Sequence, residues 1–298
     1  MAIRGTLPKH LEVAARTGVL IAPARPAVGW RQVAMDVDLT ARRTTLVDLG
    51  GVPLPTENPQ VVQDILERGL DIEPKDYYVS VSISQNAIDD DQTGTLLNRF
   101  RNIQAGFDKH IEKLAFQTLN GGDGTTYGLA YDGQEFFDND HVDKGADYQT
   151  AQDNEFALAL SLDNFETVYT AAQLFRDDKS NFTNYIYDLL VCHPSSLRIA
   201  TNIVGNPAAY DTGNREDNPY SGRMKSVLTS PELDTTAWYL LATSESAKPL
   251  FVGMRKRPEL TGIEFDAQAE DGGKHIFTYH ARYVAGYGDW RLAVQGNS

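Results

Sequence analysis

The chain has 298 residues, of which 41% are hydrophobic and 23% charged, so it can bury the core of one large domain or two modest ones. No apolar run approaches the roughly 20 residues of a membrane span, and the first residues lack the apolar stretch of a signal peptide. The net charge of −14 without a basic block argues against a protein that grips nucleic acid through its phosphates, since that binding depends on Lys and Arg, and favours solubility through self-repulsion.

The first predicted strand covers residues 33–39, where side chains alternate with a period of two. Its expected buried face consists of Val33, Met35, Val37 and Leu39. A long excursion follows, with a short predicted helix that begins at Asn58 and Pro59 and ends at Gly69. This excursion is too small for a core of its own, and we expect it to pack on another molecule. A second alternating strand begins at Tyr77.

The longest helical pattern covers residues 95–119, because apolar side chains recur at steps of three and four. They are Leu96, Phe100, Ile103, Phe107, Ile111 and Leu114. The triplet Asp89, Asp90 and Asp91 precedes it, and we interpret these residues as N-terminal caps favoured by the helix dipole rather than as a cation cluster. The helix is expected to end at the glycine-rich break that starts at Gly121.

The second half mixes helices and strands, which indicates an α+β protein. A polar loop is expected over residues 147–155, followed by a helix from Asp163, where Glu166 has capping-box spacing. Residues 185–192 form a buried-strand candidate, and a helix capped by Ser195 or Ser196 should end at Gly205. Further strands are predicted at residues 238–242, 249–254, 263–267 and 276–284.

Few residue groups suggest chemistry. Asp138, Asn139, Asp140 and His141 could ligate a metal, but local hydrogen bonding in a turn is the favoured interpretation. Cys192, the single cysteine, lies in an apolar run that predicts a buried thiol.

Neither Cys192 nor Ser195 has the glycine-flanked elbow of a nucleophile. His275 and His280 should face opposite sides of a strand. We therefore assign no catalytic, cofactor-binding or metal-binding residue and expect a protein that is not an enzyme and needs no cofactor.

Two basic clusters stand out in this acidic chain. Arg255, Lys256 and Arg257 form one, and Arg42 with Arg43 forms the other. They could be ordinary solvated charges, or they could meet acidic patches on neighbouring copies, since Arg pairs well with carboxylates. The sequence supports both interpretations equally.

Two unusual runs and a basic motif carry a family resemblance. The first run is residues 131–141, Tyr-Asp-Gly-Gln-Glu-Phe-Phe-Asp-Asn-Asp-His, and the second is residues 281–290, which ends in Ala-Gly-Tyr-Gly-Asp-Trp. Residues 255–258, Arg-Lys-Arg-Pro, lie between them. In this order the motifs resemble the major head (capsid) subunit of Mu-like tailed phages.

The resemblance implies the Hong Kong 97-type capsid fold. The implied divisions are an N-terminal arm and leading strand (1–43), an extended loop (44–76), a peripheral domain (77–159) with a spine helix (95–119), an axial domain (160–254), return strands of the peripheral domain (255–285) and a C-terminal tail in the axial domain (286–298). Lys75 is the only lysine of the expected extended loop, and we predict no covalent cross-link between subunits. Without a long charged helical leader, we also expect no removable scaffolding domain.

The resemblance also implies a function. It suggests a phage or prophage shell protein that self-assembles into hexamers and pentamers of an icosahedral head around double-stranded DNA, without specific DNA binding or a membrane. Portal and scaffolding proteins, and possible decoration proteins, would be partners, with assembly in the bacterial cytoplasm and the virion as destination. Two alternatives stay open: a nanocompartment shell of the same fold, or a metal-dependent hydrolase that uses Asp138 and His141.

Overall fold

The fold was obtained as a computed structural model of the 298-residue chain. It describes residues 13, 29–39, 43–47, 67–71, 73–90, 95–142, 148–177, 179–205, 218–269 and 272–298, with the backbone alone for 43–47, 67–71 and 95–101. Among these residues no helix is both long and apolar enough to cross a membrane.

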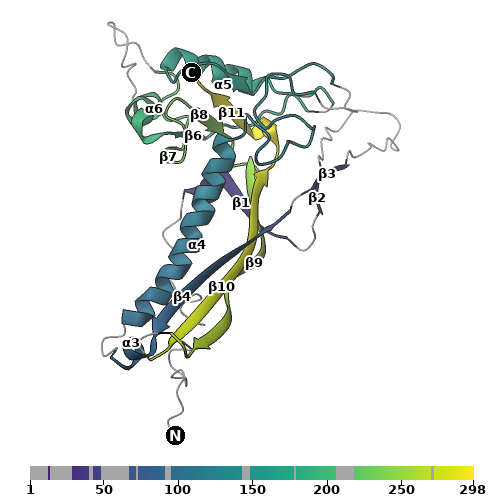
Figure 1. The fold of residues 1–298 in the computed structure, drawn as a ribbon. Coiled ribbons are helices and arrows are strands. Elements are labelled where there is room, and N and C mark those ends of the chain that lie inside the picture. Colours follow the sequence, from purple (N-terminus) through teal and green to yellow (C-terminus); the bar gives the residue numbers. More distant parts are fainter. Residues whose placement is uncertain are drawn as a thin grey trace.

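The lower part of the molecule is a four-stranded sheet with a long helix along it, which we call the stem (Figure 1). Its strands, in spatial order, are β1 (Ala34–Asp38), β9 (Leu250–Asp266), β10 (Lys274–Tyr287) and β4 (Lys75–Ser84). Its helices are α2 (Trp30–Val33), α3 (Gln85–Asp89) and α4 (Thr95–Asn120). Strand β1 pairs with β9 in parallel, and the other pairs are antiparallel. At 1.5 Å per residue, the 26-residue α4 is about 39 Å long.

The upper part is a five-stranded sheet with two helices, which we call the crown. Its strands, in spatial order, are β5 (Glu155–Phe156), β11 (Ala293–Gly296), β8 (Trp238–Leu241), β6 (Leu189–Cys192) and β7 (Ser226–Thr229). Its helices are α5 (Leu162–Gln173) and α6 (Leu197–Gly205), with two short 3₁₀ turns, η1 (Pro194–Ser196) and η2 (Trp290–Leu292). A separate antiparallel pair, β2 (Arg43–Val47) and β3 (Glu67–Asp71), comes from the excursion before β4.

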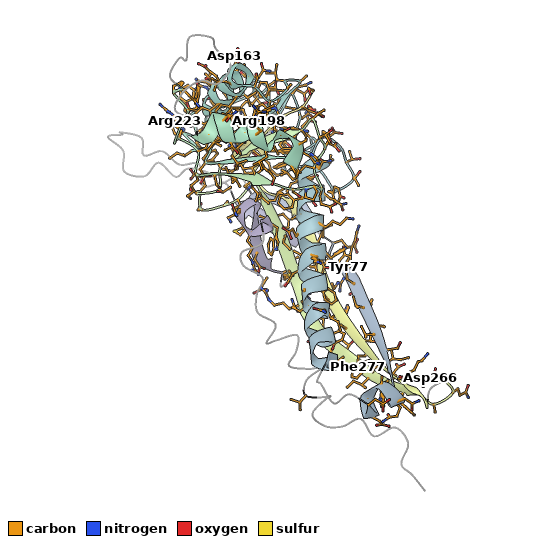
Figure 2. The ribbon with its side chains drawn as sticks, turned by 90° about the vertical axis from the view of Figure 1, so that its left-hand side faces the viewer. Tyr77, Asp163, Arg198, Arg223, Asp266 and Phe277 are labelled. Carbon is orange, nitrogen blue, oxygen red and sulfur yellow. The ribbon has the colours of Figure 1, made fainter. Side chains whose placement is uncertain are left out.

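The molecule is elongated. In the view turned by 90°, Asp163, Arg198 and Arg223 mark the crown, while Phe277 and Asp266 mark the far end of the stem (Figure 2). Strands β9 and β10 run between these parts: β9 follows β8 out of the crown, and β10 returns toward η2 and β11. The stem and the crown are therefore tied by continuous strands rather than by a flexible linker.

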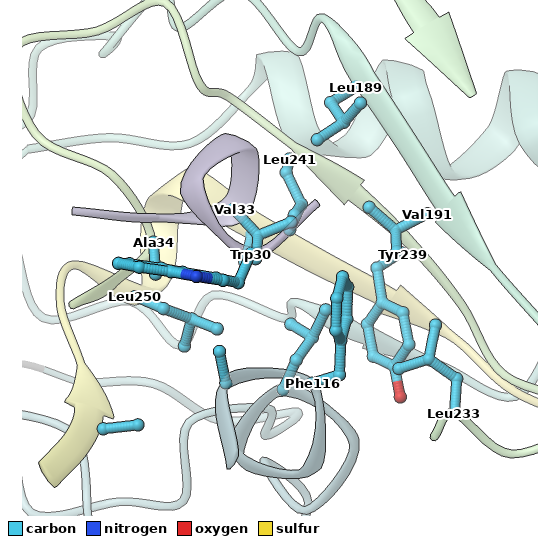
Figure 3. Packing of buried hydrophobic residues seen from close by; sticks show 14 of the residues in the cluster. Trp30, Val33, Ala34, Phe116, Leu189, Val191, Leu233, Tyr239, Leu241 and Leu250 are labelled. Atoms are coloured by element: carbon cyan, nitrogen blue, oxygen red, sulfur yellow. The ribbon is translucent and has the colours of Figure 1, made fainter. Parts of the chain in front are cut away.

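One hydrophobic core runs through both parts. Trp30 and Val33 of α2 and Phe116 of α4 belong to the same buried cluster as Tyr239 and Leu241 of β8 (Figure 3). The cluster continues down the stem to residues such as Ile83 and Ile103 and up into the crown. Burial of apolar area at about 25 cal/mol per Å² makes this shared core the main favourable term for both parts.

Several predicted elements are confirmed. Helix α4 begins at Thr95 and ends one residue beyond the expected limit, at the turn that starts with Gly121. Strand β10 contains the strand predicted at residues 276–284 and buries every second residue of it, Phe277, Tyr279, Ala281 and Tyr283. The first strand is also present, although Met35 is 38% exposed, contrary to the predicted buried face.

The two strands predicted at residues 249–254 and 263–267 are one strand, β9. Pro258 lies inside it, where the register against β10 shifts between His280 and Arg282. Proline, which cannot donate a backbone hydrogen bond, is tolerated at such an irregularity. The predicted interruption between residues 254 and 263 was therefore wrong, because the register shift allows Pro258 to lie inside one continuous strand.

Three helix-end predictions were wrong. Gly69 lies in strand β3 rather than at a helix end, and residues 58–66 fall outside the described part of the chain. Asp89 ends the separate helix α3, and Asp90 is its C-cap, so these carboxylates do not begin α4. Helix α5 is capped by Ser161, whose Oγ accepts a hydrogen bond from the backbone N–H of Asn164 at 3.2 Å.

Candidate functional site

The run at residues 131–141 follows α4 and the glycine turn and packs where the stem meets the crown. Phe136 and Phe137 are fully buried, and the ring of Phe136 stacks on Tyr287 at the end of β10 with 4.6 Å between centroids. A Cβ added to Gly122 would lie 2.5 Å from the ring of Phe137, so the close approach of this loop to the end of α4 requires glycine.

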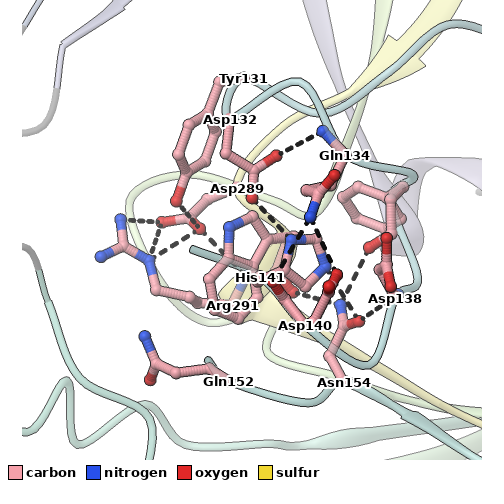
Figure 4. Close-up of polar contacts among 12 residues, drawn as sticks. Tyr131, Asp132, Gln134, Asp138, Asp140, His141, Gln152, Asn154, Asp289 and Arg291 are labelled. Atoms are coloured by element: carbon pink, nitrogen blue, oxygen red, sulfur yellow. Dashed lines mark hydrogen bonds and ion pairs between the residues drawn. The ribbon is translucent and has the colours of Figure 1, made fainter. Parts of the chain in front are cut away.

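Asn154 is the centre of a buried polar network in this region (Figure 4). Its Nδ2 donates to the backbone carbonyls of Phe136 (2.9 Å), Trp290 (3.3 Å) and Ala293 (3.2 Å). Its Oδ1 accepts from the backbone N–H of Asp138 at 2.9 Å. One side chain thus joins the loop after α4 to the entries of β5 and β11.

His141 completes the network. Its Nδ1 lies 2.6 Å from Oδ2 of Asp132, whose side chain is fully buried, and its Nε2 lies 3.2 Å from Oδ1 of Asn154. The imidazole stacks on the indole of Trp290 with 4.1 Å between centroids and an interplanar angle of 3°. The imidazole of His141 therefore has the indole of Trp290 on one face and a polar side chain at each of its two nitrogens.

The residues on either side of Trp290 in the sequence, Asp289 and Arg291, form an ion pair. Arg291 donates from Nε and Nη2 to the carboxylate of Asp289, with the Nη2–Oδ2 distance at 2.9 Å, and the hydroxyl of Tyr131 reaches the same carboxylate at 3.4 Å. Tyr187 donates its hydroxyl to the carbonyl of Arg291 at 2.6 Å, and burial raises its pKa well above the ordinary value. The two runs of the family resemblance, residues 131–141 and 281–290, therefore meet in one place.

The network provides structure rather than an open reaction centre. The carboxylate of Asp138 accepts from the backbone N–H of Asn139 at 2.6 Å, and Gln134 donates to Asp140 at 2.9 Å, so local hydrogen bonding in the turn is confirmed. Among the described residues, no three His, Cys, Asp or Glu side chains gather as a metal site. Asn154 was missed because the polar stretch 147–155 was interpreted as an exposed loop; it is 0% exposed.

The other predicted groups are also placed. Cys192 is fully buried as expected, and burial raises its pKa to about 11. The hydroxyl of Ser195 lies 2.8 Å from Nδ1 of His193, which caps η1 at the surface and also accepts the backbone N–H of Ser195. His275 contacts Gln85 and His280 contacts Asp76 from opposite faces of β10, as predicted.

The basic cluster at residues 255–257 is satisfied within the chain. Arg257 pairs with Asp36 (3.4 Å) and Asp38 (2.9 Å) of β1, and Lys256 pairs with Glu259 (2.7 Å). The side chains of Arg257 and Lys256 are still 57% and 38% exposed, so solvated charges and pairing with neighbouring copies both stay predictions. Arg42 lies outside the described residues, as does the side chain of Arg43.

A groove of about 400 Å³ opens on the stem beside this junction. It is lined by the start of β4 (Lys75 and Tyr77), by Leu114 of α4, by the loop at Tyr127 and by Tyr287 at the end of β10. The walls are largely aromatic and aliphatic, without a convergent set of catalytic side chains.

The family comparison agrees with this geometry. A family model described as phage capsid protein matches residues 69–295. The major capsid protein of Escherichia phage Mu is 25% identical over 271 residues, which cover 89% of this chain and 65% of that protein. The Mu-like prophage FluMu major head subunit of Haemophilus influenzae is 23% identical, with 93% of this chain and 68% of that protein covered.

The structural comparison shows the fold. The procapsid of bacteriophage JBD30 superposes with a TM-score of 0.59 at 22% identity, over 97% of this chain and 74% of that one. The chain spans just under two thirds of the length of the Mu protein. The α+β arrangement of stem and crown is thus the Hong Kong 97-type capsid fold expected from the sequence, and the chain belongs to the phage capsid protein family.

Proposed function

We propose that this chain is the major head subunit of a Mu-like tailed phage or prophage. Copies would associate into hexamers and pentamers of an icosahedral shell that encloses double-stranded DNA, assembled in the bacterial cytoplasm and retained in the virion. The observation that carries the proposal is the family match over residues 69–295, which extends through both the stem and the crown.

We assign the stem to the peripheral domain and the crown to the axial domain of this fold. The arm (1–43), the extended loop (44–76) and the C-terminal tail (286–298) complete the assignment. The sheets support boundaries near β5, which starts at Glu155 in the crown sheet, and β9, which starts at Leu250 in the stem sheet. Glu155 and Leu250 lie within a few residues of 160 and 254, the limits of the axial domain expected from the sequence.

Such a protein acts through contact area rather than chemistry. Several interfaces per subunit, each weak enough to reverse during assembly, add up to a stable closed shell. An isolated β2–β3 pair is at most marginally stable in water, which supports a neighbouring copy as the partner of the excursion. The net charge of −14 suits a wall that encloses DNA without gripping it.

We also propose portal and scaffolding proteins as assembly partners, with decoration proteins as further candidates. These follow from the proposed role in a phage head. Co-purification of assembled particles from a producing cell would show whether they are present.

Electron microscopy of the purified chain tests the proposal. Closed shells, or six- and five-membered rings, are the expected result; only small discrete particles under all assembly conditions would contradict it. Nucleic acid extracted from shells after nuclease treatment separates a phage head from a nanocompartment, which would contain protein cargo instead. An activity lost in His141→Ala together with a bound metal would favour the hydrolase.

A further inference from the structure

Strand β4 is an open edge of the stem sheet, because it pairs with β10 on one side and with no described strand on the other. Its ten residues keep one unbroken register against β10. Proteins shield such edges with short strands, bulges, prolines or charged residues. Strand β1, the opposite edge, is short and includes Asp36 and Asp38, whereas β4 has charges only at its first two residues, Lys75 and Asp76.

One hydrogen bond shows which residues of β4 direct their backbone groups outward. The backbone N–H of Gln85 donates to the carbonyl of Gly273 at 2.8 Å, next to the paired residues Ser84 and Lys274. Successive residues of an antiparallel strand alternately bond the neighbouring strand and turn away from it. The odd-numbered residues of β4 therefore bond β10, and the even-numbered ones direct N–H and C=O to the open edge. These outward residues are all exposed: Asp76, Tyr78, Ser80 and Ser82.

The side chains of β4 alternate in the same way. Tyr77, Val81 and Ile83 lie on the face covered by α4 and pack with the buried core. Val79 lies on that face too, but it is 38% exposed. The centre of the open edge thus combines unpaired backbone groups with an uncovered apolar side chain, which favours the addition of a strand.

We propose that β4 pairs antiparallel with β4 of a second copy, across a two-fold axis that passes through Val79. In this register Asp76 lies opposite Ser82 of the second copy, and Tyr78 lies opposite Ser80. These are hydrogen-bonded pairs, so the outward N–H and C=O groups of all four residues gain partners. A contact of this kind is self-complementary, as a two-fold interface requires.

The side chains fit the same register. Val79 lies opposite Val79 of the second copy, and Tyr77 lies opposite Val81, so apolar residues face apolar residues across the axis. Lys75 lies opposite Ile83 and Asp76 opposite a serine, so no like charges are opposed.

Other axes fit less well. An axis at Tyr78 would set Ser82 opposite Pro74, which has no N–H to donate. An axis at Ser80 would set Asp76 opposite Ser84, whose carbonyl, as the N-cap, already belongs to helix α3. The axis at Val79 leaves neither defect.

The pairing also determines how the two copies are placed. Because the paired strands run in opposite directions, the crowns would lie at opposite ends of the pair (Figure 1). The two stem sheets would become one continuous sheet, with both α4 helices on the same face and the two Val79 side chains between them. Under the proposed function the pair would join two rings rather than neighbours within one. This placement, unlike the pairing itself, rests on the proposed function.

Cysteine cross-linking of the full-length chain tests the pairing. Val79→Cys puts two thiols at the axis, where opposite Cα atoms about 4.5 Å apart are within the range of a disulfide. The native Cys192 is fully buried and gives no competing link. Mild oxidation should convert most of this variant to a covalent dimer on a non-reducing gel. Met35→Cys on β1, a residue that is also 38% exposed, is the matched control and should stay monomeric.

A proline on the edge tests whether the dimer depends on backbone pairing. Ser80→Pro removes one outward N–H without removing a hydrogen bond to β10, so the fold should be kept, as circular dichroism can check. In the Val79→Cys chain it should lower the dimer yield by about tenfold or more. Ser80→Ala keeps the N–H and should keep the dimer.

Equal yields from Val79→Cys and Met35→Cys, or no dimer from Val79→Cys at any concentration, would overturn the proposal. A dimer that Ser80→Pro leaves unchanged would do the same. Hydrogen-exchange protection of Tyr78 and Ser80 that rises with concentration, without a Val79→Cys link, would assign the edge to another segment and also overturn it. Dimers without shells would contradict the proposed function alone, and shells without the Val79→Cys link would contradict the pairing alone.

Discussion

At the scale of single residues, the junction depends on a few buried polar side chains. Asn154 satisfies four backbone groups on three segments, and Tyr187 and Arg291 extend the bonding into the crown. A buried polar group that loses its partner costs about 1–3 kcal/mol, so each residue that supplies several partners matters more than its size suggests.

Asn154→Ala should therefore lower the free energy of unfolding by about 3 kcal/mol or more, because it leaves several buried groups without partners. The midpoint of denaturant unfolding measures this effect. Asn139→Ala, at an exposed position of the same region, is the control and should change the midpoint little. Similar losses in both variants would contradict the central position of Asn154.

A second residue-scale prediction concerns Asp188. Burial alone would raise the pKa of Asp188, but hydrogen bonds from Ser244, Thr243 and Lys225 outweigh it and lower the pKa. Its stabilising effect is then present above about pH 4 and is lost as pH falls through the lower folded value. Asp188→Asn should cost about 2 kcal/mol at neutral pH and weaken the acid-induced loss of stability.

Unfolding curves from neutral pH to about pH 3 check this behaviour. Exposed Asp234→Asn is the matched control and should keep the wild-type acid response. If Asp188→Asn loses stability toward low pH as steeply as the wild type does, the carboxylate of Asp188 contributes nothing to the acid-induced loss of stability.

At the scale of elements, short caps determine where helices begin. Ser161 supplies the cap of α5, and Ser84 supplies that of α3 through an Oγ that accepts the backbone N–H of Ala87 at 3.3 Å. The backbone of both capping serines is extended, as caps require. The capping hydroxyl sets each boundary, and in α5 it does so in place of Asp163, the acidic residue of the first turn.

Ser161→Ala should cost about 1 kcal/mol, the usual loss of an N-cap. Asp163→Ala should cost less, since Asp163 sits in the first turn and contributes through the helix dipole alone. Thermal unfolding of the two variants measures both changes. If Asp163→Ala loses more stability than Ser161→Ala, the helix start predicted at Asp163 from the sequence would be correct.

The elements also show how far sequence reasoning reaches. Helix α4 and strand β10 were predictable because each has one buried face, and the pattern repeats over many residues. Strands β5, β7 and β11 have two to four residues, too few for a period to appear. The run at residues 131–141 was recognisable, but its partner Asn154 was not, because burial of a polar side chain depends on distant strands.

At the scale of the whole molecule, two sheets share one core. The buried cluster contains Ile83 near the far end of the stem and Leu240 in the crown. Separation of the parts would expose Phe116 and Tyr239 together. The stem and the crown should therefore not be stable independently.

We expect a single cooperative unfolding transition for the unassembled chain. Variants that retain only Trp30 in the stem, or only Trp238 in the crown, report the two parts separately by fluorescence. Their curves should coincide with each other and with circular dichroism. Two separate midpoints would contradict a shared core.

The unbroken strands give the molecule the properties of a lever. Strand β9 has 17 residues and β10 has 14, so at about 3.3 Å per residue they extend roughly 45–55 Å from the crown. A tilt of about 5° at one end displaces the other by roughly 4–5 Å, given this length. In a closed array of such subunits, a slight rotation of the crown would therefore move the far end of the stem. This movement would change the curvature of the array at a neighbouring subunit that the crown itself does not contact.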